Sequence, residues 1–434
     1  MRLSPLFMIS LLTFSSISQA ELSLDSTIQN ALSSDHWNQS SIYQEQALHA
    51  KAIASAQLPD PRLRLGLANL PTDSFDFQQE NMTQLQLGVS QQFPRGQSLE
   101  LSQQQWQQKA AKSLLQRQLR AASVKLNVSQ AWLKLHQSKA QLAHFKAKQH
   151  IFNELVAVSR ANYRSGKALR HEVLDAEVKL TQLKDRMLQL EQMIQVQKGA
   201  LQQWLTVESF DQSIATGFDL DLLFSGKITQ TEQDRSILKH PQIQILKQNI
   251  VIEDKAVDLA DQAYKPAFKL DANYGYRADH ENGRDRADLF SVAVTMDLPL
   301  FPEKRQDQHR RAAVQLREAS KAIYLLKARE LRAELVIAKA NLQGYEQRLA
   351  IYNQAYLKQL AAKRKSALRA YASAESGFKA VSIAAMEELE AQQQQILLEH
   401  QVAMATAKIN FYFAGEDPTV INNAHPAQGG MNNE

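Results

Sequence analysis

Residues 58–71 read LPDPRLRLGLANLP, a run in which Leu63, Leu65 and Leu67 alternate with Arg62 and Arg64. A side-chain period of two is typical of a β-strand, which presents successive residues to opposite faces. The rest of the chain is rich in Ala, Gln, Leu, Lys and Glu, which favour helices. The stretch therefore predicts a short strand with one apolar and one polar face in a mainly helical protein.

Three further alternating runs indicate that this unit is duplicated. Pro61 precedes the first run and Pro94 closes the second, while Pro266 and Pro299 bracket another pair with the same separation of 33 residues (94 − 61 and 299 − 266). The predicted strands cover about residues 62–70, 83–93, 268–277 and 288–298. Each pair precedes a long stretch poor in Gly and Pro. We therefore predict two copies of one strand–strand–helix unit.

Each predicted strand has the length and the alternation of a tilted transmembrane strand. The polar faces, which we expect to line a lumen, include Arg62, Arg64, Gln84, Gln86, Lys269 and Asp271. A soluble four-stranded sheet packed on helices would show the same alternation, so that alternative stays open. A bilayer does not tolerate open sheet edges, and bacterial barrels need at least about eight strands. One chain cannot close a barrel; two copies would supply 8 strands and three would supply 12.

The first 20 residues and the composition limit the classes of protein to which the chain can belong. Residues 1–20, MRLSPLFMISLLTFSSISQA, predict a secretory signal peptide with cleavage after Ala20. No other segment approaches ~18 consecutive apolar residues, so no transmembrane helix is predicted. The chain has no cysteine, which excludes disulfides and thiolate chemistry. Its 50 Lys and Arg are interleaved with 45 Asp and Glu, so we expect no nucleic-acid binding.

Two long helical hairpins follow the strand pairs. From Gln97 to Ser165 no Gly or Pro occurs, which is enough for a rod of roughly 100 Å. Mostly apolar residues then recur at spacings of three and four, as in a coiled-coil seam. They are Leu180, Leu183, Met187, Leu190, Ile194, Gln197, Leu201 and Trp204 in the first repeat, and Leu331, Leu335, Ala338, Leu342, Tyr345, Leu349, Tyr352 and Tyr356 in the second. Gly166 and Gly377 mark the points where each rod folds back. A soluble fibrous coiled coil is the alternative.

The predicted organisation is two repeats followed by a tail. Residues 21–235 form the first repeat, with a hairpin over about 97–204 and an equatorial segment over 205–235; residues 236–415 form the second, with a hairpin over about 303–413; residues 416–434 form a flexible tail.

From Asp25 to about Gly415 the chain resembles the TolC-like outer-membrane efflux proteins. The resemblance rests on the repeat, the strand pairs and the motif ANYRSGKALRHEVLDAEVKL at residues 161–180. LPDPRLRLGLANLP together with MTQLQLGVSQQFPRG is similar to the branch that partners heavy-metal resistance-nodulation-division (RND) pumps. The resemblance implies a homotrimer in which four strands per chain complete a 12-stranded barrel in outer-membrane lipid, continued by a helical α-barrel through the periplasm.

The resemblance also implies a passive channel without catalysis or cofactor, coupled through a periplasmic adaptor to an inner-membrane pump. Heavy-metal cations are the expected substrates, with drug or protein export through the same architecture as the alternative. A periplasmic coiled-coil adaptor is a further alternative, but no lipoyl-like β-domain is visible. The eleven histidines are scattered, so we expect metal to be cargo and not a bound cofactor.

Site residues follow from the same resemblance. Acidic residues after the second hairpin turn are expected to line the closed end and select cations, which points to Glu387 and Glu388. Alignment of the two turns places Glu387 at the position of Asp175, but the second acidic position of the family is Ala384 here. A solvated helix surface is the alternative. The candidates for adaptor contact or for ion pairs that close the entrance are Tyr163, Arg164, Gly166, Lys167, Arg170, Asp175 and Gly377.

Overall fold

The computed structural model describes residues 21–205, 214–221, 229–280, 283–373 and 375–423. The predicted signal peptide, residues 206–213 and 222–228 of the equatorial segment and residues 424–434 of the tail lie outside this part of the chain. The chain divides into two compact units. Their described residues are 21–35, 123–205, 214–221, 337–373 and 375–411 in the first unit, and 36–122, 229–280, 283–336 and 412–423 in the second. Each unit takes segments from both predicted repeats, and the repeat boundary at 235 stays a prediction.

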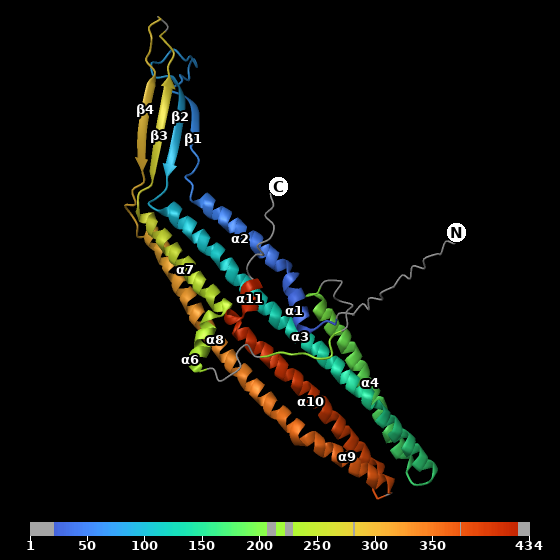
Figure 1. Cartoon of the computed structure of the whole chain (residues 1–434). Helices are drawn as coiled ribbons and strands as arrows, with labels where there is room; N and C mark the ends of the chain where they lie inside the picture. Colours follow the sequence, from blue (N-terminus) through green and yellow to red (C-terminus); the bar gives the residue numbers. More distant parts are fainter. Residues whose placement is uncertain (1–20, 206–213, 222–228, 281–282, 374, 424–434) are drawn as a thin grey trace, which may run out of the picture. The chain divides into compact units, whose positions relative to one another are not determined.

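The second unit contains one antiparallel sheet. Its strands are β1 (Arg62–Ala68), β2 (Gln84–Phe93), β3 (Phe268–Tyr276) and β4 (Leu289–Met296), and they lie side by side in the order β1-β2-β3-β4 (Figure 1). The central contact, between β2 and β3, joins the two predicted strand pairs into a single sheet. The predicted fold class, mainly helical with four strands, is confirmed.

The second unit also contains several helical segments. They are α2 (His36–Ser55), α6 (Gln230–Lys239), α7 (Pro241–Asp261), a 3₁₀ turn at Gln262–Tyr264, a second 3₁₀ turn at Ala414–Glu416, α11 (Pro418–Asn423) and the first parts of α3 (Ser98–Arg164) and α8 (Gln306–Ile351). Thr229 and Glu232 form a capping box at the start of α6. Gly96 has a φ of +49°, which lets the chain turn from β2 into α3.

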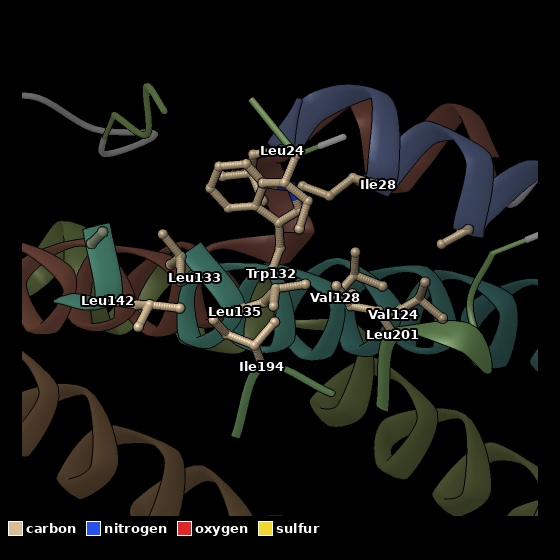
Figure 2. Packing of buried hydrophobic residues seen from close by; sticks show 13 residues of the cluster. Leu24, Ile28, Val124, Val128, Trp132, Leu133, Leu135, Leu142, Ile194 and Leu201 are labelled. Atoms are coloured by element: carbon tan, nitrogen blue, oxygen red, sulfur yellow. The ribbon is translucent and has the colours of Figure 1, made fainter. Parts of the chain in front are cut away.

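The first unit is helical and has its own apolar core. It comprises α1 (Leu24–Ser33), α4 (Arg170–Gln202), the π-helical turn Tyr352–Tyr356, α9 (Leu357–Ala372), α10 (Phe378–Tyr412) and the remaining parts of α3 and α8. Figure 2 shows Trp132 of α3 among Leu24, Ile28 and Val128. The indole is fully buried, and its Nε1 donates a hydrogen bond to the carbonyl of Leu22 at 3.1 Å. This core fixes α1 on α3.

No helix in the described ranges is both long enough and apolar enough to cross a bilayer.

Candidate functional sites: a two-faced sheet and two helical turns

The strand register aligns the apolar side chains of all four strands. Leu65 lies opposite Leu87, Leu87 opposite Tyr274, and Tyr274 opposite Phe290. We call this side of the sheet the apolar face; its exposed members are Leu63, Leu65, Leu67, Leu85, Leu87, Val89, Phe93, Phe268, Leu270, Tyr274, Tyr276, Phe290, Val292, Val294 and Met296. Leu65 exposes 70% of its surface and Phe290 69%. A sheet packed on helices would bury such residues, so this face is built for an apolar environment outside the chain.

The opposite side, the polar face, holds all six residues predicted to line a lumen. Arg62 pairs with Ser90, which in turn lies opposite Asp271, and Gln92 lies opposite Lys269. The Nζ atom of Lys269 lies 2.6 Å from Oδ1 of Asp271, so the two charges compensate each other within the strand.

Glutamines and glycines complete the polar face. Gln86 lies opposite Gly66 on one side and Gly275 on the other. Gln84 is buried, and its side-chain oxygen occupies the space that a Cβ on Gly275 would need. Toward the ends of the strands that join the helices, a cavity of about 150 Å³ is lined by Asp60, Arg62, Ser90, Gln92, Lys269, Thr295 and Asp297. Both acids and bases line it, so it carries no preference for one sign of charge.

The first hairpin turn brings together most of the residues predicted to contact an adaptor or to close the entrance. α3 ends at Arg164 and α4 begins at Arg170. Gly166 has a φ of +74°; its N–H donates to the carbonyl of Tyr163 at 3.0 Å, and the N–H of Lys167 donates to that of Asn162 at 2.8 Å. This pair of bonds is a Schellman motif, which requires a residue like glycine in the left-handed region. Tyr163, Arg164, Lys167 and Arg170 are exposed around the turn, and Asp175 is exposed further along α4.

The second hairpin turn is anchored by an aromatic residue. α9 ends at Ala372 and α10 begins at Phe378, directly after the exposed Gly377. Phe378 is buried and meets the ring of Tyr371 edge-on, with centroids 6.1 Å apart. The side-chain amide of Asn162, in the first turn, donates a hydrogen bond to the hydroxyl of Tyr371 at 2.6 Å. The sequence did not predict this pair, although Asn162 lies inside the motif that carries the family resemblance.

The two acidic gate candidates differ in their surroundings. Glu387 is half-exposed, and its Oε2 lies 2.5 Å from Nζ of Lys363. Glu388 exposes only 9% of its side chain and accepts a hydrogen bond from Nε of Arg364. In the single chain both carboxylates are therefore paired with bases of α9. Ala384, on which the sequence resemblance places the second acidic position, is fully buried, so a carboxylate there would have no access to water.

Comparison with known proteins gives a match in structure only. No family model and no curated protein matches the sequence. The solved structure of CusC, studied for the conformational changes that accompany folding and transmembrane channel formation, matches with a TM-score of 0.75 and 14% identity over 91% of this chain and 92% of its own. VceC of Vibrio cholerae matches at 0.72 and 15% identity over 90% and 96%, and the CmeC channel of Campylobacter jejuni at 0.74 and 14% over 92% and 88%.

The chain has the fold of these outer-membrane channels. The TolC-like architecture predicted from the repeat and the strand pairs is therefore confirmed. In this TolC-like fold, no group of three or more His, Asp or Glu side chains that could hold a metal ion occurs among the described residues.

Proposed function

We propose that this chain is an outer-membrane channel, a passive exit duct in a tripartite efflux system. The apolar face carries the proposal, because its exposed side chains lie on one side of a sheet whose other side is polar. This is the arrangement of a transmembrane barrel wall, with lipid outside and water inside. Arg62, Arg64, Gln84, Gln86, Lys269 and Asp271 would then face the lumen.

The proposed channel is a homotrimer. Within the described residues β1 and β4 each pair with a neighbour on one side only, and hydrocarbon gives an unpaired strand edge no hydrogen-bond partner. Three chains would supply 12 strands and pair β4 of one copy with β1 of the next. Leu316, Ile323 and Leu326 on α8 are exposed at spacings of seven and three, which suits packing against a helix of a second copy.

The proposed partners are a periplasmic adaptor and an inner-membrane RND-type pump, which would meet the turns around Gly166 and Gly377. Glu387 and Glu388 are the proposed selectivity residues of that end, once the pairs with Lys363 and Arg364 open. Heavy-metal cations are the proposed substrates on the strength of the sequence resemblance, with drug or protein export as the competing possibility. An adaptor or a structural coiled coil is disfavoured, because neither uses an exposed apolar sheet face.

Conductance in a planar lipid bilayer tests the proposal. The full chain, purified in detergent, should be recovered as a trimer by chemical cross-linking and should give discrete, cation-selective conductance steps. A chain that stays monodisperse without detergent and never conducts would contradict the channel. For the substrate, a deletion strain should lose resistance to heavy-metal cations more than to dyes and detergents; the reverse order would support drug export.

A further inference from the structure

A chain of hydrogen-bonding contacts links two histidines of the first unit to two backbone carbonyls. Nδ1 of His136, on α3, lies 2.8 Å from Nε2 of His400, on α10. The other nitrogen of His136 lies 3.0 Å from the carbonyl oxygen of Thr216, and the other nitrogen of His400 lies 2.7 Å from that of Ile396. All four ring nitrogens are therefore in use.

The two carbonyls at the ends of this series of contacts determine how many hydrogens the two imidazole rings must carry. A carbonyl oxygen only accepts, so each terminal nitrogen must carry hydrogen, and the central contact needs a third. Two neutral imidazoles carry one N–H each, which makes two. Three hydrogen bonds therefore form only when the pair holds one proton more than its neutral state, whichever tautomers are present.

The apolar surroundings of His136 and His400 disfavour the binding of this additional proton. The ring of His136 stacks on Trp132 with centroids 5.1 Å apart, Phe218 meets His136 edge-on, and His400 is 2% exposed. Burial lowers the pKa of His136 and lowers that of His400 to about 4, while the carbonyls of Thr216 and Ile396 act in the opposite direction. Near neutral pH the pair is accordingly neutral and one of its three contacts lacks a hydrogen.

The contact with Thr216 is the one that the neutral pair loses. His400 keeps its hydrogen on the nitrogen that faces the carbonyl of Ile396, so its buried Nε2 carries a lone pair. His136 then places its single hydrogen on the nitrogen that faces this Nε2, because otherwise two lone pairs would face each other. The second nitrogen of His136 is left with a lone pair against the carbonyl of Thr216. That residue is exposed, so water can replace the contact there.

Four other charged groups lie on the elements around the two histidines, and none of them takes part in the series of contacts. They are Lys139 on α3, Lys198 on α4, Asp219 beside Phe218, and Glu399 on α10. Of these four, Lys139 is the one whose charge acts on His136, and it lowers the pKa further. Lys198 acts on Lys139, and burial raises the pKa of Glu399.

We propose that His136 and His400 form a proton-binding site whose occupancy fastens residues 214–220 to helices α3 and α10. The bound proton is shared along the central contact and completes the bond to the carbonyl of Thr216. Acid adds this bond to the contacts that already hold the segment, among them Phe218 against His136, and neutral pH removes it. The inference concerns residues 214–220 and does not depend on the chain conducting ions.

A spin label at residue 216 tests the site directly. The chain has no cysteine, so Thr216→Cys places a single nitroxide on the exposed segment and keeps the backbone carbonyl that accepts the bond. Electron paramagnetic resonance of the full chain in detergent should show an immobile component that grows as the pH falls from 7.5 to 4. For a one-proton site the ratio of immobile to mobile label should rise about tenfold for each unit by which the pH falls.

Matched variants identify the group that binds the proton. In the labelled background, His136→Gln and His400→Gln should each abolish the pH response, whereas His150→Gln, at an exposed histidine of the same helix, and Asp219→Asn should preserve it. Circular dichroism checks that each variant folds; if His400→Gln does not, His136→Gln at the half-buried position decides. An unchanged label from pH 7.5 to 4, or a response that survives His136→Gln, would overturn the proposal.

Discussion

The side-chain amide of Asn162 donates a hydrogen bond to the hydroxyl of Tyr371 at 2.6 Å, which joins two hairpin turns that are 209 residues apart in the sequence. Tyr371→Phe removes the hydroxyl and keeps the ring that packs on Phe378. We expect a loss of about 1 kcal/mol at the turns, the usual contribution of one hydrogen bond. If the turns close the channel, single-channel recordings should show longer or larger openings.

The control for this bond is Tyr43→Phe, which removes a hydroxyl from an exposed tyrosine of α2, outside both turns. Its conductance should match that of the unmodified chain. Equal conductance for Tyr371→Phe and the unmodified chain would show that the bond between Asn162 and Tyr371 does not control opening.

Two adjacent ion pairs should differ strongly in their contribution to stability. Arg364→Gln leaves Glu388, with 9% of its side chain exposed, as a buried charge without its partner. Removing one member of a buried pair costs about 3 kcal/mol. Lys363→Gln frees Glu387 at a half-exposed position, where an ion pair contributes less than about 1 kcal/mol.

Thermal unfolding followed by helical circular dichroism measures both variants. The Arg364→Gln variant should unfold at a clearly lower temperature than the Lys363→Gln variant. Under the proposed function, Lys363→Gln should in turn increase cation selectivity, since it frees a carboxylate at the closed end. Equal melting temperatures would mean that Glu388 finds another partner.

These ion pairs also show where prediction from the sequence stops. The sheet could be predicted because a period of two assigns every residue of a strand to a face, and the register then keeps Leu65, Leu87 and Tyr274 on one side. Glu387 and Glu388 are neighbours on a helix and both pair with bases of α9, and the sequence does not say which of the two carboxylates is buried. That choice depends on how α9 and α10 pack.

The predicted coiled-coil seam shows the same limit. Leu331, Leu335, Ala338 and Leu342 are buried as the heptad spacing predicts. The predicted continuation through Tyr352 to Tyr356 is wrong, because these residues form a π-helical turn and Tyr356 is exposed. A π-turn has one more residue per turn than an α-turn, so it rotates every later side chain around the helix. The spacing of the apolar residues before the π-turn does not predict it.

A pair of substitutions at adjacent positions of β4 tests the orientation of the sheet. Val292→Arg puts a charge on the apolar face, whereas Ala293→Arg puts the same charge on the polar face, opposite Asp271. In a membrane barrel the first should cost about 2–4 kcal/mol and the second little or nothing. We expect Val292→Arg to reduce the trimer recovered from the outer-membrane fraction, and Ala293→Arg to leave it unchanged. The opposite ranking would mean that the apolar face does not contact lipid.

The histidine pair should make the folded chain less stable in acid. In the folded chain burial depresses the pKa of His400 to about 4, whereas an unfolded histidine titrates near 6.5. Above pH 6.5 neither state is protonated, so His400 costs nothing; between 6.5 and 4 only the unfolded state takes up the proton, and stability falls. The full difference is on the order of 3 kcal/mol. His400→Gln should flatten the melting temperature between pH 6.5 and 4 relative to the unmodified chain, while His150→Gln should not. A slope that His400→Gln leaves unchanged would assign the acid sensitivity to other groups.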